Sequence, residues 1–86
     1  MSIRKLNDNF NVISDNLIKL RMAKHLSQAD VAGDLNLLGI NIHKNDISRI
    51  EANARAVKDY ELYGFAKVLD VSILDLLDGI EDKLEK

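Results

Sequence analysis

The richest binding chemistry in the chain lies near its middle, where basic, amide and hydroxyl side chains surround two isoleucines. Ile47 and Ile50 are three residues apart, so they lie on one face of a helix. If that face packs on a core, four polar side chains point away from it, namely Lys44, Asn45, Ser48 and Arg49. Long donors and amides pair with the guanine and adenine edges in the major groove of DNA. Any amphipathic helix has a polar outer face, so the surrounding elements must support this interpretation.

An earlier helix is expected to cross the one that carries these side chains. Ser27 and Asp30 have the Ser-x-x-acid spacing of a capping box and open it. Its buried stripe follows the helical period and consists of Val31, Leu35 and Leu38. Gly39 is expected to end it, and Ala32 is small enough for the second helix to cross closely. The spacing predicts two helices joined by a turn.

The remaining periodicity predicts an all-α fold of five helices. The first runs from about Ile13 to Lys24, with His25 as a left-handed cap, and the fourth begins at a capping Asp59. Ser72 opens the fifth with a second capping-box spacing. We expect a flexible N-terminal arm over residues 1–11, a domain over 12–78 and an acidic C-terminal tail over 79–86.

Several short motifs in order resemble the Xre family, the lambda-repressor-like (Cro/CI-type) helix-turn-helix regulators. The motifs are Leu26-Ser27-Gln28, Val31-Ala32, Ile47-Ser48-Arg49-Ile50-Glu51, Ala66-Lys67-Val68-Leu69, Val71-Ser72 and Leu76-Leu77. The resemblance covers about residues 13–78. It implies a five-helix lambda-repressor-like domain and a sequence-specific, double-stranded DNA-binding regulator of transcription. It further implies a repressor that occupies an operator as a homodimer.

The resemblance also assigns roles to individual residues. Gln28 matches a glutamine that holds a phosphate and buttresses the reading helix. The positions that contact bases are matched by Lys44, Asn45 and Arg49, with Ser48 on the same face. Arg55 and Lys58 match positions that grip the sugar-phosphate backbone. Arg21 and Glu51 match a structural salt bridge between the first helix and the end of the reading helix.

Three features depart from the family pattern. Eighteen residues separate Gln28 from Ile47, several more than in the shortest relatives, and we interpret Asn36–Ile40 as an extended second helix and turn. His43 stands where Ser or Thr usually caps the reading helix, so its ring is either a weaker cap or a phosphate contact. Asn53 stands where glycine often follows the glutamate, and asparagine tolerates the left-handed backbone.

Asp46 lies among the basic side chains near the outer face, and two roles are open to it. An acid in the first turn stabilises the positive end of a helix. It could also accept a hydrogen bond from a cytosine amino group. We favour the capping role.

Composition limits the other classes of function. The net charge is −2, but residues 70–86 carry a balance of −4 and residues 1–69 a balance of +2, so the acidity is mostly C-terminal. The chain has no cysteine, no glycine-rich phosphate loop and only two histidines. We therefore expect no enzyme activity, no metal, no cofactor and no small-molecule effector. Without a signal peptide or membrane span, the expected location is cytoplasmic.

The C-terminal end suggests how two copies could join. Ile73, Leu77, Ile80 and Leu84 are spaced by four, three and four residues, the seam of a helix pair. Gly79 opposes this, since it can end the helix. Two alternatives to a plain regulator stay open: an antitoxin that also binds a toxin protein, and a protein-interaction module that has lost DNA affinity.

Overall fold

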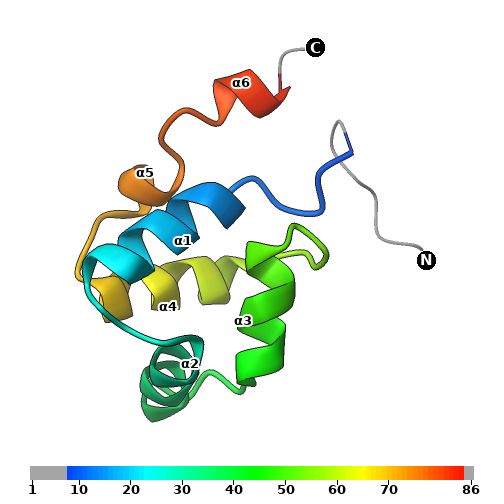
Figure 1. Ribbon diagram of the computed structural model, residues 1–86. Coiled ribbons are helices and arrows are strands. Elements are labelled where there is room, and N and C mark those ends of the chain that lie inside the picture. Colours follow the sequence, from blue (N-terminus) through cyan, green and yellow to red (C-terminus); the bar gives the residue numbers. More distant parts are fainter. Residues whose placement is uncertain (1–7, 85–86) are drawn as a thin grey trace.

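The regular elements of the computed structural model, which describes residues 8–84, are helices (Figure 1). Their bounds are α1 (Ser14–Ala23), α2 (Gln28–Leu37), α3 (Lys44–Glu51), α4 (Asp59–Leu69), α5 (Ile73–Leu76) and α6 (Glu81–Leu84). The predicted all-α class is confirmed, and a short sixth helix follows the five expected ones. None of the described helices is long and apolar enough to cross a membrane.

One apolar core is shared by the five helices from α1 through α5, and it fixes the orientation of α3. The fully buried side chains from these helices include Leu17, Val31, Leu35, Ile47, Ile50, Phe65, Leu69 and Leu76. Figure 1 shows α1 and α4 side by side, with α2 below them and α3 to their right. Ile47 and Ile50 each contribute roughly 1.5–3 kcal/mol through burial. Because both point inward, the opposite face of α3 must point outward.

The helix ends follow from local hydrogen bonds that the sequence pattern predicted. Ser27 Oγ accepts from the Asp30 N–H at 2.9 Å, and Asp30 accepts from the Ser27 N–H at 2.9 Å. Ser72 and Asp75 form the same reciprocal pair at the start of α5. Asp59 is the first residue of α4 rather than its cap, because Lys58 occupies the N-cap position.

The turns depend on residues that accept a left-handed backbone. His25 and Asn53 have φ of 58° and 56°, as their positions predicted, and Gly39 has φ of 86° after the end of α2. Asp70 ends α4 in the same conformation, with φ of 55°, and was not predicted to do so. In that conformation an L side chain is crowded, which is why glycine and asparagine are the usual choices.

The longer connection between α2 and α3 is held by side-chain hydrogen bonds. Asn36 Nδ2 donates to the carbonyls of Ile40 and Ile42 at 3.0 Å, and Ile42 is buried. Leu38, predicted to belong to the buried stripe of α2, instead follows the end of that helix and is 49% exposed. The helical period cannot place a residue once the helix has ended.

The C-terminal residues do not form the continuous seam that their spacing suggested. α5 ends at Leu76, and Gly79, with φ of 76°, separates it from α6. Ile73 and Leu84 therefore lie on different helices, and Leu77 packs against the core. The Lys83 ammonium of α6 lies 3.1 Å from Asp15 of α1. The continuous helix expected over residues 73–84 is therefore wrong, while the dimer contact assigned to these residues stays a prediction.

Only residues 8–11 of the expected N-terminal arm are among the described residues. Residues 1–7, and residues 85–86 of the expected tail, lie outside the described residues. Asn11, which was placed in the arm, is buried and bound to the domain: its Nδ2 donates to the carbonyls of Ile50 and Arg55 at 3.0 Å. Residue 11 is thus part of the packed body, because its amide satisfies carbonyls at the end of α3.

Candidate nucleic-acid interface

The outer face of α3 carries the side chains that the sequence singled out. Each of the four is exposed, namely Lys44, Asn45, Ser48 and Arg49. They share this face because Ile47 and Ile50 occupy the buried one. The result is a helix that presents two long cations, one amide and one hydroxyl to the solvent.

The N-terminus of α3 is closed by a reciprocal cap between His43 and Asp46. His43 Nδ1 accepts from the Asn45 N–H, and Asp46 Oδ2 accepts from the His43 N–H, both at 3.0 Å. The hydrogen bond from the His43 N–H is the largest cause of a lowered pKa at Asp46; desolvation opposes it, and the charges of Arg55 and Arg49 lower the pKa by smaller amounts. Of the two roles open to Asp46, the capping role is the one the structure shows.

The C-terminus of α3 is anchored through Glu51. Arg21 of α1 donates to both Glu51 oxygens, from Nε at 2.6 Å and from Nη2 at 3.0 Å. The Glu51 side chain is only 6% exposed, and its hydrogen bond raises the pKa of Arg21. This ion pair, which the resemblance implied, ties the end of α3 to α1.

Gln28 joins the same cluster from the start of α2. Its Nε2 donates to Glu51 Oε1 at 2.9 Å, so it buttresses α3 as the resemblance implied. The other N–H of this half-buried amide lies at the N-terminus of a capped ten-residue helix. Backbone N–H groups at such an end attract anions. The N-terminus of α2 and the basic outer face of α3 are therefore both suited to an anionic ligand.

Arg55 was predicted to grip a phosphate, but the structure gives it an internal partner. Its Nη1 and Nη2 donate to the two oxygens of Glu61 at 2.9 Å, and Glu61 is 1% exposed. A buried carboxylate without this partner would be strongly disfavoured. The guanidinium is therefore held by the fold, and its phosphate contact stays a prediction.

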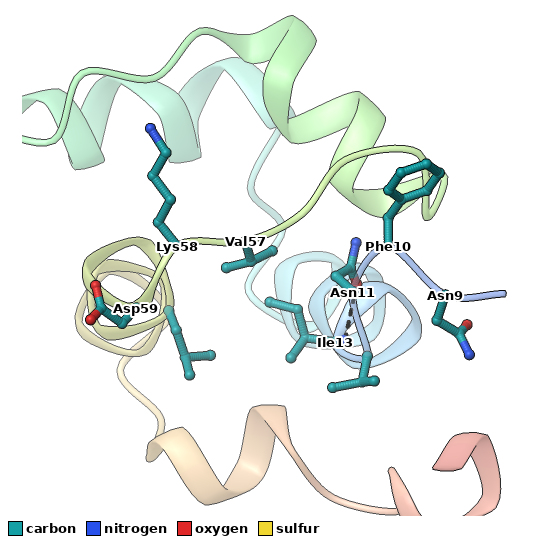
Figure 2. A pocket seen from close by; sticks show the side chains of 9 residues that line it. Asn9, Phe10, Asn11, Ile13, Val57, Lys58 and Asp59 are labelled. Atoms are coloured by element: carbon teal, nitrogen blue, oxygen red, sulfur yellow. Dashed lines mark hydrogen bonds between the residues drawn. The ribbon is translucent and has the colours of Figure 1, made fainter. Parts of the chain in front are cut away.

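Lys58 keeps an exposed ammonium at the start of α4. Its Nζ lies 5.7 Å from the centre of the Tyr60 ring. The residue also borders a cavity of about 230 Å³, whose walls include Asn11, Ile13 and Val57. Figure 2 shows the Lys58 side chain pointing away from those walls, which leaves its charge available to an external anion.

Sequence reasoning missed the polar contacts that hold the loop after α3. Asn53 Oδ1 accepts from the N–H groups of Phe10 and Asn11, at 2.9 and 3.2 Å. Glu61 was also missed, although its place three residues after Lys58 has the spacing of a capping box. Within residues 8–84, no group of three side chains is arranged to hold a metal ion.

A pair of packed helices, α2 and α3, with α3 capped and anchored, and four further described helices together define the fold of a helix-turn-helix regulator. A solved structure with this fold is the restriction-modification controller protein C.Esp1396I, a tetramer in complex with its natural 35 base-pair operator. The match has a TM-score of 0.67 and 26% sequence identity, and it covers 90% of this chain and 95% of that one. No protein-family model matches the sequence, and no curated protein matches it significantly.

Proposed function

We propose that this protein is a sequence-specific double-stranded DNA-binding regulator of transcription of the Xre type. The observation that carries the proposal is the exposed face of α3, whose residues Asn45 and Arg49 lie opposite the buried Ile47 and Ile50. An α-helix fits the major groove, where arginine pairs with guanine and asparagine with adenine. The likeness to an operator-bound controller protein supports this reading.

The contacts divide by chemistry into those that read bases and those that position the protein. Lys44, Asn45 and Arg49, with Ser48 beside them, face the base edges in this proposal. Gln28 and Lys58 contact the sugar-phosphate backbone, where contacts set register but carry no sequence information. Arg21, Glu51 and Arg55 act on the placement of α3 from inside the protein.

We further propose that the protein acts as a homodimer and represses by occupying its operator. One small module makes few base contacts, and two copies on half-sites about one helical turn apart multiply them. The controller protein that shares the fold was solved as a tetramer on its operator. Blocking an operator needs no cofactor and no small-molecule effector.

Selection from a pool of random DNA duplexes tests the proposal. We expect the protein to enrich one sequence, and fluorescence anisotropy to show binding to that duplex at least a thousandfold tighter than to a scrambled one. Affinity should fall steeply with salt, because phosphate contacts release counterions. Failure to enrich any sequence, with the fold intact by circular dichroism, would refute sequence-specific binding.

A second candidate function is supported by apolar side chains on the surface. Leu37 is 86% exposed and Leu74 is 76% exposed, and exposed apolar surface can mark a protein-binding site. An antitoxin that binds a toxin protein, or an interaction module without DNA affinity, would use such residues. A DNA titration that stays flat at low salt would favour the interaction module. Tight DNA binding together with capture of a small toxin would favour the antitoxin.

A further inference from the structure

Asp46 lies in the first turn of α3, and its two oxygens have different partners. Oδ2 accepts the hydrogen bond from the His43 N–H that caps the helix. Oδ1 faces two guanidinium groups, 3.1 Å from Nη2 of Arg49 and 3.7 Å from Nε of Arg55. The cap therefore holds the carboxylate in place whether or not Arg49 moves.

A row of charges connects this carboxylate to the interior. Arg55 is fixed by the two hydrogen bonds that it donates to Glu61 and by a third, from Nη1 to the Ala56 carbonyl at 2.9 Å. Side-chain exposure rises along the row, from 2% at Glu61 to 19% at Arg55, 27% at Asp46 and 62% at Arg49. The exposed Arg49 guanidinium is thus paired with Asp46, which also contacts the fixed Arg55.

We propose that Asp46 is a positioning residue that sets the direction of the Arg49 guanidinium and so decides which base edge Arg49 reads. This inference rests on the proposed function, since it assumes that α3 enters the major groove. A bidentate contact with guanine requires one orientation of the planar guanidinium. Holding that orientation before binding lowers the conformational entropy that binding costs.

The attraction between Asp46 and Arg49 becomes stronger when DNA is bound. An exposed pair three residues apart contributes little in water. In a groove from which water is displaced, the same two charges attract each other more strongly, because the effective dielectric constant falls. Asp46 also restricts the alternatives, since a guanidinium that stays beside it cannot reach every base that a free arginine could reach.

The Asp46→Asn substitution separates positioning from capping. The amide oxygen of asparagine can still accept from the His43 N–H, while its NH₂ group faces the two arginines and removes the ionic attraction. Asp30→Asn is the matched control. Asp30 accepts from the Ser27 N–H at 2.9 Å in the equivalent cap of α2, and the ion pairs of the described residues do not include it.

The measurement uses the duplex selected by the wild-type protein and every single base-pair variant of it, with affinities from fluorescence anisotropy. We expect D46N to reduce discrimination about tenfold at the one base pair where Arg49→Ala also does so. In the double variant we expect no further loss at that base pair. D30N should raise or keep the affinity for every duplex alike and leave discrimination unchanged.

Two outcomes would overturn the inference. D46N could retain the wild-type discrimination at the Arg49 base pair, or it could change the affinity for all duplexes by one common factor as D30N does. Thermal melting of D46N and D30N checks that both caps survive. If the wild-type protein selects no duplex at all, the proposed function fails, and this inference fails with it.

Discussion

Arg55 and Glu61 are joined by two parallel hydrogen bonds, from Nη1 to Oε1 and from Nη2 to Oε2, each 2.9 Å long. Glu61 Oε1 also accepts from the Lys58 N–H at 2.9 Å. This pair links the loop after α3 to the first turn of α4, and its carboxylate is almost fully buried. It therefore stabilises the position of α3 without lying on its outer face.

Arg55→Ala should destabilise the fold rather than remove a phosphate contact. It leaves the buried Glu61 carboxylate without its main partner, so we expect a loss of about 2–3 kcal/mol in the free energy of unfolding, measured with urea. Lys19→Ala, on the exposed side of α1, is the control and should stay within about 0.5 kcal/mol of wild type. An R55A variant of unchanged stability but flatter salt dependence of DNA binding would restore the phosphate role.

The stability of the protein should depend on pH through Glu61. Burial opposes ionisation of this carboxyl, but hydrogen bonds from Arg55 and the Lys58 N–H outweigh it and lower the pKa of Glu61 below its ordinary value of 4.5. A lowered folded-state pKa gives stability above the ordinary pKa that is lost as pH falls through the folded value. We expect urea midpoints to drop below about pH 4.5, and to drop less in Glu61→Gln. Parallel curves for the two proteins would contradict this assignment.

Arg21 and Glu51 should be energetically coupled. Their bidentate contact is mostly buried, with side-chain exposures of 15% and 6%, so a double-mutant cycle to alanine should give about 1–2 kcal/mol of coupling. Lys83 and Asp15 provide a control cycle, because Asp15 is 79% exposed and such pairs contribute about 0.5 kcal/mol or less. Equal coupling in the two cycles would make Arg21 and Glu51 ordinary surface charges.

Substitutions on the outer face of α3 should change selectivity, whereas Lys58→Ala should change affinity alone. Asn45→Ala and Arg49→Ala each remove a base contact, and we expect a loss of about 1–3 kcal/mol in discrimination with unchanged melting. Lys58→Ala removes one phosphate contact, so binding to all duplexes should weaken equally and the salt slope should fall by about one counterion. Wild-type selectivity in N45A and R49A would remove α3 as the reading helix.

Self-association should not require the residues after Asp78. Because α5 and α6 are separate, we expect truncation after Asp78 to leave the sedimentation of the dimer unchanged. Leu74→Glu places a charge at an exposed apolar position of α5 and should shift the protein toward monomer. Leu37→Glu is the matched control on α2. If truncation alone produces monomers, or only L37E does, the second copy does not pack on α5.

The sequence by itself determined the features that depend on neighbouring residues. The capping boxes at Ser27 and Ser72, the left-handed turns at His25 and Asn53, and the inward face of α3 all follow from spacings of a few residues. Such patterns are readable because a helix places residues three or four apart on the same face, and because caps join residues two or three apart.

Tertiary structure alone decided which distant groups became partners. In the sequence, Arg55 and Lys58 are two similar cationic residues of the same loop. The fold places the buried Glu61 beside Arg55, whereas the Lys58 side chain faces solvent. Asn11 reaches the carbonyls of Ile50 and Arg55 across about forty residues of chain. The physical reason is that a buried polar group must be satisfied by whatever the packed helices place beside it, and no local spacing encodes that neighbour.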